Sequence, residues 1–204
     1  NTGAVSLTND SAFAIDTVNT VGLTTSGNTT FSSIAAVTQT QKVAATGLEL
    51  LGTGGSYTLT NASNNVATLA ANTGTLSFAN SANLAVDTVN TVGITTNTGD
   101  VTLVSNNGVT VSANINSNGN DIAITANGNG GTSKGFEQSA GTINAGAGDI
   151  AIVGTTKTAT GWPNRIGADV RGTITGNNIS ITGTSDTAAA TDGMGVQFQG
   201  ASSV

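Results

Sequence analysis

The chain has 204 residues, of which only 8% are charged and 3% aromatic, with 28 glycines, one proline and a net charge of −6. A typical globular domain carries about 25% charged residues, so an ordinary charged surface around an aromatic-rich core is excluded. Abundant Val, Ile and Thr with a modest net charge also argue against disorder.

Missing residue types exclude several functions. Cysteine and histidine are both absent, which excludes disulfides, ordinary zinc sites and histidine acid–base catalysis. With five Lys and Arg residues and a pI near 4.1, the chain is not expected to bind nucleic acid, which requires clustered basic side chains. The sequence starts at Asn1 without a signal-peptide pattern and contains no run of 18 apolar residues. We therefore expect no membrane insertion and interpret the chain as part of a longer protein.

The most informative feature is an internal repeat. Residues 16–22 return letter for letter at positions 87–93, and the match extends without a gap from residues 2–25 onto residues 73–96. Solenoid repeat units usually have about 20–50 residues, so we interpret the offset of 71 residues as three coils of about 24. On this interpretation Val89 and Ile94 point into the core, in columns shared with Val18 and Leu23.

Alternation of apolar with small or polar residues predicts short β-strands in the first half of the chain. They are expected at residues 4–7, 48–50, 56–59 and 75–78. Clusters rich in Gly and Asn at residues 53–55, 61–65 and 72–74 predict corners, because these residues accept left-handed backbone or cap it with a side chain. Residues 30–47 depart from the pattern and are expected to form a short helix or an irregular coil.

A plainer repeat begins at Gly99. A Gly, Asn or Asp corner leads into an apolar strand four times, at residues 99–103, 119–124, 148–152 and 176–181. The corner glycines lie 20, 29 and 28 residues apart, so the coils are expected to lengthen by loop insertion, which a solenoid accepts at one face. The last coils share a second strand, expected at residues 135–137, 167–170 and 195–198.

These patterns predict an all-β fold, a parallel β-helix in which residues 1–204 form one continuous segment. We expect roughly eight coils of about 20–30 residues, with coils of about 24 residues over 1–98 and longer coils with insertions over 99–204. A unit of this size cannot bury its own apolar face, so units must stack strand on strand, and corner Asn residues can form ladders between coils. The alternative is a string of β-sandwich domains, which normally need larger aromatics in their cores.

Four stretches carry a resemblance to a known family: residues 46–62, 69–78, 88–95 and 147–154. They resemble the repeat region of large bacterial exoproteins of the filamentous haemagglutinin type, the passengers of two-partner secretion. The resemblance covers nearly the whole chain. It implies a right-handed β-helix, secretion to the surface of a Gram-negative-type bacterium through an outer-membrane partner acting on another part of the protein, and a role in adhesion. The Asn-Pro-Asn-Gly-type motif of that family's secretion domain does not occur, and Pro163 does not supply it, so the chain corresponds to the shaft.

Chemical motifs provide no candidate catalytic, cofactor-binding or metal-binding residue. Residues 131–135 match the Gly-x-Ser-x-Gly nucleophile elbow, but that motif requires a histidine base, which the chain lacks. Polysaccharide-cleaving β-helices need clustered carboxylates or a basic residue across a cleft, whereas the aspartates here are interpreted as turn residues scattered one per corner. They are Asp16, Asp87, Asp100, Asp121, Asp149 and Asp169. We therefore expect neither enzyme activity nor a cofactor.

Two polar patterns have both a ligand-binding and a structural interpretation. Asn114, Asn116, Asn118 and Asn120 lie beside Asp121, but one carboxylate is little charge for a calcium ion that takes six to eight oxygens, so a corner ladder is favoured. Thr-x-Thr pairs at 58/60, 173/175 and 182/184 resemble ice-binding faces without recurring at a fixed offset, so they are expected to be solvent-facing strand residues.

The function expected from the sequence is an extracellular structural or adhesive filament segment. It would serve as an adhesin stalk that attaches to host-cell, glycan or biofilm-matrix surfaces and self-associates end to end through unpaired strands. The alternatives are an ice- or carbohydrate-binding solenoid and a polysaccharide-cleaving β-helix.

Overall fold

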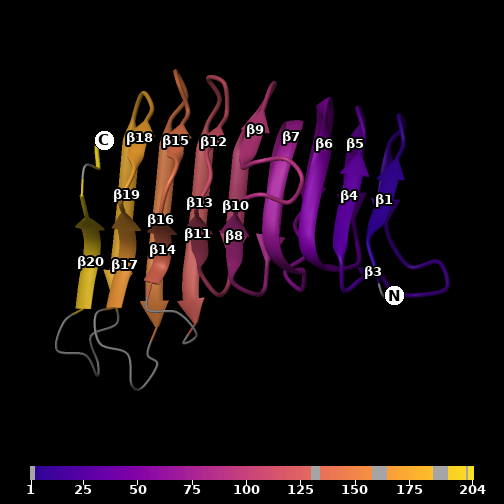
Figure 1. The fold of residues 1–204 in the computed structure, drawn as a ribbon, viewed down its shortest axis with the longest axis horizontal. Coiled ribbons are helices and arrows are strands. Elements are labelled where there is room, and N and C mark those ends of the chain that lie inside the picture. The colour runs from indigo at the N-terminus through magenta and orange to yellow at the C-terminus, as the bar shows by residue number, and fades with distance from the viewer. Residues whose placement is uncertain (1–2, 130–133, 158–164, 186–192, 201) are drawn as a thin grey trace.

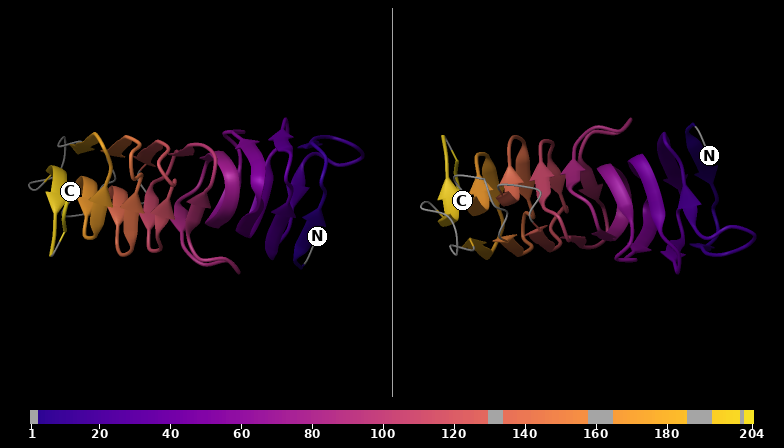
Figure 2. Two further views of the ribbon diagram at one scale, coloured as in Figure 1. Left: turned by 90° about the horizontal axis from the view of Figure 1, so that it is seen from above. Right: turned by 90° about the horizontal axis from the view of Figure 1, so that it is seen from below.

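The computed structural model describes residues 3–129, 134–157, 165–185, 193–200 and 202–204. Within these residues the chain forms twenty β-strands and no helix. The strands stack side by side into an elongated rod, and the two termini lie at opposite ends of it (Figure 1, Figure 2). The predicted all-β class is confirmed, and the parallel stacking is consistent with a β-solenoid.

Two ladders of parallel strands run along the rod. The first contains β2 (Phe13–Ile15), β5 (Ala36–Gln39), the second halves of β6 (Val43–Leu59) and β7 (Asn65–Asn80), β10 (Val101–Ser105), β13 (Ile122–Asn129), β16 (Ile150–Lys157) and β19 (Ile179–Ser185). The second begins with β1 (Val5–Thr8), β4 (Asn28–Ser32) and the first halves of β6 and β7. The short strand β3 (Leu23–Thr24) pairs with the start of β6.

Beyond β7 the second ladder divides into two branches. One branch contains β8 (Leu84–Val86), β11 (Val109–Val111), β14 (Lys134–Gln138), β17 (Arg165–Val170) and β20 (Gly193–Phe198). The other contains β9 (Ile94–Thr96), β12 (Ile115–Asn116), β15 (Thr142–Asn144) and β18 (Thr173–Thr175). The loop at residues 87–93 separates them, since β8 and β9 pair with successive stretches of β7.

The pairing decides between the two predicted architectures. Every pairing between the described strands is parallel, and the antiparallel bridges Thr17–Val21 and Thr88–Val92 lie within single loops. A β-sandwich needs antiparallel sheets, so that alternative is wrong. The four corner-to-strand motifs of the second half stack as predicted, as do the second strands β14, β17 and β20.

Residues 30–47 were expected to form a helix or an irregular coil, and this expectation is wrong. The region contains β4, β5 and the start of β6, and Val37 is fully buried. The local alternation there is weak, but β4 has a strand to pair with on each side, β1 and β6. Hydrogen bonding to neighbouring coils therefore imposes strand structure that the local sequence does not indicate.

The predicted corners at residues 53–55 and 72–74 do not interrupt their strands. β6 and β7 continue through them, and the ladder shifts register between Gly52 and Ser56. Gly52 has φ +118°, and a Cβ on Gly55 would lie 2.1 Å from the Ser33 carbonyl oxygen. Glycine thus bends the strand closely around the preceding coil while the pairing continues, as in a β-bulge. The corner at residues 61–65 does separate β6 from β7.

The internal repeat does not correspond to three complete coils. Successive pairings lead from Val5 to Thr29, Leu48 and Leu69, whereas Leu76, the repeat partner of Val5, stacks in the column of Phe13. Coil lengths vary in this half, because paired residues are 24 positions apart from Val5 to Thr29 but 19 positions apart from Thr30 to Glu49. The repeated segments therefore lie on different sides of the rod.

Their inward residues were only partly predicted. Ile94 is buried and Leu23 packs against the core, but Val18 is 89% exposed. Val89 is half-buried and lies on the outside of the rod against Gly47. The assignment of the two valines to core columns is wrong, because residues 16–22 and 87–93 leave the ladder as loops.

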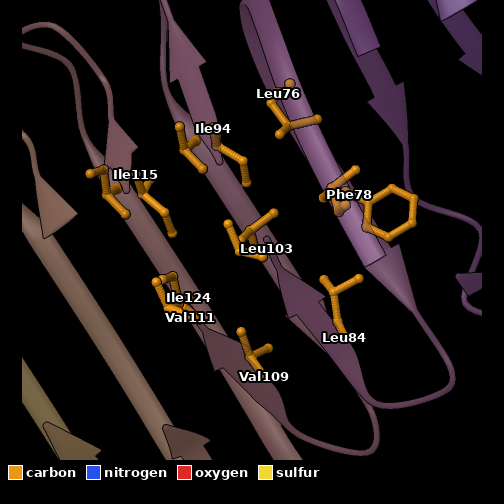
Figure 3. Packing of buried hydrophobic residues seen from close by; sticks show 14 of the residues in the cluster. Leu76, Phe78, Leu84, Ile94, Leu103, Val109, Val111, Ile115 and Ile124 are labelled. Atoms are coloured by element: carbon orange, nitrogen blue, oxygen red, sulfur yellow. The ribbon is translucent and has the colours of Figure 1, made fainter. Parts of the chain in front are cut away.

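The core is one continuous cluster of apolar side chains, stacked in columns along the inside of the rod. In Figure 3, Leu76, Leu103 and Ile124 come from neighbouring strands of the first ladder. They face Ile94, Ile115 and Val111, which come from the two branches of the second ladder. The buried residues are mainly Val, Ile, Leu and Ala with a few aromatics, as predicted. At one corner the core also contains a buried side-chain amide, that of Asn64. Asn64 Oδ1 accepts the Val43 N–H at 2.7 Å, and the amide groups of Asn64 and Gln39 exchange two hydrogen bonds.

In the C-terminal half, the first ladder touches the branch that contains β14, β17 and β20. The contact is made by a glycine seam, defined as Gly135, Gly154, Gly167, Gly183 and Gly195. A Cβ on Gly154 would lie 2.0 Å from the Gly167 oxygen, and one on Gly183 would lie 1.8 Å from the Gly195 oxygen. Backbones can approach this closely only without side chains. The seam holds β14, β17 and β20 directly against β16 and β19.

Candidate functional site

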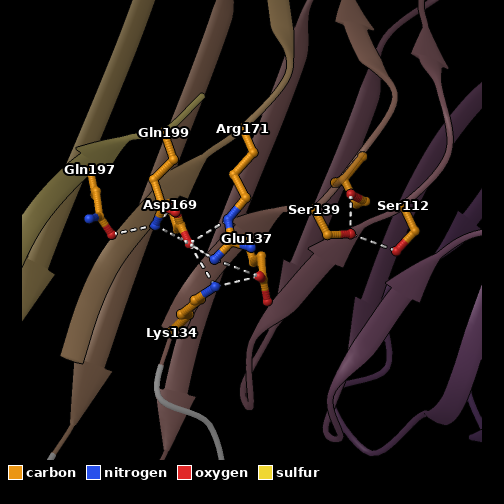
Figure 4. A network of polar contacts seen from close by, with 9 residues as sticks. Ser112, Lys134, Glu137, Ser139, Asp169, Arg171, Gln197 and Gln199 are labelled. Carbon is orange, nitrogen blue, oxygen red and sulfur yellow. Dashed lines mark hydrogen bonds and ion pairs between the residues drawn. The ribbon is translucent and has the colours of Figure 1, made fainter. Parts of the chain in front are cut away.

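Among the described residues, the largest group of ionised side chains lies on the outward side of β14, β17 and β20 (Figure 4). We call it the charged cluster: Lys134, Glu137, Asp169, Arg171, Gln197 and Gln199. Parallel register places the outward residues Glu137, Asp169 and Gln197 directly above one another on successive strands. A sequence stretch of 66 residues is thereby brought to one small area of the surface.

Asp169 is the centre of the cluster. Its side chain has no exposed surface, and its Oδ2 lies 2.6 Å from Lys134 Nζ and 2.8 Å from Arg171 Nη2. Gln199 Nε2 donates to Asp169 Oδ1 at 3.1 Å and to Gln197 Oε1 at 2.7 Å. Both oxygens of the buried carboxylate thus face donors, and Oδ2 faces two cations, which compensates the cost of burying its charge.

Glu137 completes the cluster at its edge. It is paired with Lys134 and lies 3.5 Å from Arg171 Nη2, with 24% of its side chain exposed. The hydrogen bond from Arg171 to Asp169 raises the pKa of Arg171, and the charge of Glu137 acts in the same direction. Two cations and two carboxylates therefore form a closed, locally neutral network.

The network differs from a glycosidase carboxylate pair. Such enzymes use one protonated and one ionised carboxyl group on either side of the scissile bond, both in contact with the substrate. Asp169 is buried beneath Lys134 and Arg171, so a sugar on this surface would contact Arg171, Glu137 and Gln197 and not Asp169. The arrangement suits hydrogen bonding to hydroxyl groups or cross-linking of three coils.

Replacing Asp169 with asparagine is expected to lower the free energy of unfolding by about 2–3 kcal/mol. The substitution keeps the shape but removes the charge that compensates Lys134 and Arg171, and hydrogen bonds to charged groups contribute about 1.5–3 kcal/mol each. Thermal and urea denaturation of the purified chain measure the change.

The matched control for Asp169 is Glu137→Gln, an equivalent change at the partly exposed carboxylate. Exposed ion pairs contribute about 0–1 kcal/mol, so this variant should unfold close to the wild type. Equal destabilisation by the two substitutions would contradict the central place assigned to Asp169.

The aspartates lie at corners as predicted, except Asp169, but Asp100, Asp121 and Asp149 are not scattered. At one corner the carboxylates form a ladder, in which Asp100 Oδ1 accepts the Asp121 N–H at 3.1 Å and Asp121 Oδ1 accepts the Asp149 N–H at 2.8 Å. Asp149 in turn accepts from Asn177 and Asn178, and these hydrogen bonds hold the pKa of Asp149 below its ordinary value. The signal that reveals Asp169 is its place two residues after Gly167, which repeats the spacing of Gly135 and Glu137.

The asparagine pattern also forms a ladder. Asn118 Nδ2 donates to the Thr96 carbonyl at 2.9 Å, and Asn97 Nδ2 donates to Asn72 Oδ1 at 3.1 Å on the next coil. The ladder interpretation is confirmed for Asn118, which has φ +50° and occupies the left-handed region that asparagine tolerates. In the described ranges no three carboxylates gather closely enough to hold a metal ion.

The other sequence motifs are assessed by where their residues lie in the structure. The Thr-x-Thr pairs lie at exposed or half-exposed positions, which confirms that they are solvent-facing. Residues 131–133 of the nucleophile-elbow motif, and also Pro163, lie outside the described residues. In the part of the chain that the structure describes, no helix has the length and hydrophobicity needed to cross a bilayer.

A second polar group, which the sequence did not indicate, lies around Glu49 on β6. The side chain is 3% exposed, and its two oxygens accept hydrogen bonds from Thr91 N at 2.8 Å, Thr91 Oγ1 at 2.7 Å, Asn90 Nδ2 at 2.9 Å and Thr30 Oγ1 at 2.9 Å. Glu49 thereby fastens the loop at residues 87–93 onto the outside of the rod.

Glu49→Gln is expected to lower the free energy of unfolding by about 1–3 kcal/mol at neutral pH, because the amide cannot accept all four hydrogen bonds. Burial by itself raises the pKa of Glu49, but the donors Asn90, Thr91 and Thr30 outweigh it, so the pKa lies below the ordinary 4.5. A depressed folded pKa means that this stabilisation is complete above about pH 4.5 and is lost as the pH falls through the folded pKa.

The pH dependence is checked by melting the wild type and Glu49→Gln between pH 7 and pH 2.5. The difference between their melting temperatures should shrink as the solution is acidified. A difference that stays constant down to pH 2.5 would show that the ionised carboxylate does not hold the loop.

Comparison of the chain with family models, with curated proteins and with solved structures found no match. The resemblance to filamentous haemagglutinin-type exoproteins therefore stays a prediction from the sequence motifs.

Proposed function

We propose that the chain is a shaft segment of an extracellular adhesive or structural filament, of the filamentous haemagglutinin type. In this proposal the strands wind as a right-handed β-helix of roughly eight coils, and the protein is secreted to a bacterial cell surface through an outer-membrane partner. The observation that carries the proposal is the unbroken parallel pairing from β1 and β2 to β19 and β20, which leaves strand edges at both ends of the rod. Such a rod supplies length and a repetitive surface.

The outer surface supports the same function. Its side chains are mostly Thr, Ser and Asn. Two cations and two carboxylates neutralise one another in the charged cluster, and Asp100, Asp121 and Asp149 form a corner ladder. A surface of small polar groups suits many weak contacts with host-cell, glycan or matrix surfaces. Avidity then increases with the number of contacts that can form together.

The test uses the purified chain and tandem fusions of two and three copies. We expect binding to glycan-coated and cell surfaces to be weak for one copy and to strengthen with copy number, with no turnover of acidic polysaccharides. Turnover above the level of a Glu137→Gln, Asp169→Asn double variant would overturn the proposal in favour of a glycan-cleaving enzyme.

A carbohydrate-binding module is the second candidate, and the charged cluster favours it. Arg171 is 37% exposed beside Glu137, and planar guanidinium and carboxylate groups bind sugar hydroxyls with directed hydrogen bonds. A glycan array followed by titration separates the candidates. Tight 1:1 binding of one oligosaccharide, lost in Arg171→Ala, would support the module in place of the shaft.

A further inference from the structure

Residues 16–22 and 87–93 have the same sequence and fold into the same loop. We call them the N-terminal loop and the docked loop. In each, the first aspartate accepts the N–H of the next threonine, at 2.7 Å for Asp16 and 2.8 Å for Asp87. The bridges Thr17–Val21 and Thr88–Val92 close the two loops identically.

Both loops also end in the same way. Gly22 has φ +66° and Gly93 has φ +70°. A Cβ at Gly22 would lie 2.3 Å from the Lys42 oxygen, and one at Gly93 would lie 2.2 Å from the Asn114 oxygen. Each terminal glycine thus lies against the backbone of the following coil, so both loops leave the rod in the same manner.

The docked loop has a complementary surface on the rod. Asn90 and Thr91 donate three hydrogen bonds to Glu49, which is buried beneath them. Val89 lies against Gly47, where a Cβ would come within 3.0 Å of Val89 Cγ1. The loop therefore recognises an outward Gly-x-Glu sequence on β6, a strand separated from β8 by β7.

The N-terminal loop has the same Val, Asn and Thr side chains, but no described residue packs beneath Val18 as Gly47 does beneath Val89. Val18, the counterpart of Val89, is 89% exposed. Among the described residues, neither Asn19 nor Thr20 makes a side-chain hydrogen bond, whereas their counterparts Asn90 and Thr91 both do. The difference lies in the surroundings, because the sequence and backbone of the two loops agree.

The N-terminal loop projects past the end of the rod. The docked loop extends back toward β6, and the indigo chain leading into β3 overhangs the N-terminal end beyond β1 in the same direction (Figure 1, Figure 2). Beside it, a hollow of about 350 Å³ is lined by apolar side chains, including Leu7, Phe13 and Phe31 as well as Val18. The N-terminal loop and the apolar hollow beside it are thus both open at the N-terminal end of the rod.

We propose that the N-terminal loop is a clasp for a further parallel β-solenoid segment stacked on β1 and β2, which presents an outward Gly-x-Glu sequence. Asn19 and Thr20 bind its glutamate, and Val18 packs on its glycine. The inference rests on the shaft function proposed above and names the contact that fastens one segment to the next. The Gly47–Glu49 site of a second unmodified copy is already filled by that copy's own docked loop, so isolated chains should not clasp one another.

The internal repeat supplies the test. Because residues 2–25 align on residues 73–96, residues 1–72 can be joined directly in front of residues 2–204 of the full chain with the coil pattern continued. The N-terminal loop of the full chain then lies behind an added copy of Gly47 and Glu49. Since the chain has no cysteine, single cysteines report burial through their reaction rate with a thiol reagent.

We expect Val18→Cys in the full-chain part to react at least about tenfold more slowly in the extended protein than in the 204-residue chain. Glu49→Gln in the added copy should restore fast reaction. Val89→Cys is the positive reference for a docked loop, and Val21→Cys is the matched control, because its counterpart Val92 stays 66% exposed in the docked loop.

The clasp would be overturned if Val18→Cys reacted at the same rate in both proteins. Folding of the extension is checked separately, by its added thermal transition and by the increased sedimentation rate of the extended protein. Protection in the 204-residue chain that rises with concentration would overturn it too, since it would make a second unmodified copy the occupant. Neither outcome depends on adhesion, so the clasp and the shaft function fail separately. If Val18→Cys perturbs folding, the exchange rate of the Thr20 amide provides the same comparison.

Discussion

Replacing Leu103 with aspartate is expected to lower the free energy of unfolding by more than about 5 kcal/mol, enough to unfold the coils around β10. Leu103 is fully buried and stacks between Phe78 and Ile124 on the neighbouring coils. An aspartate there would place a charge among apolar side chains, as Figure 3 shows for this part of the core. Urea denaturation followed by circular dichroism measures the loss.

Thr102→Asp is the matched control for Leu103. Thr102 is the preceding residue on β10 and points outward, half-exposed, so the same new charge remains in water and should change stability by less than about 1 kcal/mol. If both aspartate variants unfold at the same urea concentration, the inward and outward assignment along β10 is wrong.

Gly154→Ala is expected to destabilise the C-terminal half by about 3–5 kcal/mol, although it adds a single methyl group. The new Cβ would lie 2.0 Å from the Gly167 oxygen and 3.1 Å from Phe136 Cβ. Neither obstacle is the flexible end of a side chain, so β16 and β17 must move apart, and the cost is expected to exceed the usual overpacking range of about 1–3 kcal/mol. The loss of stability is measured by thermal denaturation.

Gly54→Ala controls for glycine replacement in a strand. Gly54 lies within β6, has no positive φ, and its Cβ would meet nothing closer than the Ile34 oxygen at 3.6 Å. The expected change is within about 1 kcal/mol, since fewer unfolded conformations offset any small strain. A Gly154→Ala variant as stable as Gly54→Ala would show that the sheets can separate at the glycine seam without loss.

Much of the fold was predictable because its signals are local. Alternation in the second half placed β10, β13, β16 and β19, and their corner Gly and Asp residues marked each return to the same ladder. The scarcity of large aromatics argued against sandwich domains, and the parallel pairing of the strands agrees with it. Prediction failed at residues 30–47 and at the corners within β6 and β7, where pairing with neighbouring coils outweighs local preference.

The polar sites were much less predictable. Asp169 was interpreted as a corner residue, yet it is the buried centre of the charged cluster. Its partner Lys134, which also pairs with Glu137, comes from the preceding strand of the ladder, more than thirty residues earlier. Glu49 appeared to be an ordinary strand residue, and its contacts with Asn90 and Thr91 span 41 and 42 residues. Sequence spacing alone does not identify such pairs when coil lengths vary.

The sequence by itself determined the class of structure: β-strands of period two, Gly and Asn corners, repetition, and a core of Val, Ile, Leu and Ala. These follow from backbone preferences and burial within a few residues. Only the tertiary structure decided which residues of neighbouring coils pair with each other, and so on which side of the rod each copy of the repeat lies. Register between coils depends on the length of every intervening loop, so two identical segments reached different sides of the rod. For the same reason Val89 lies over Gly47 while Val18, in the same seven letters, is exposed to solvent.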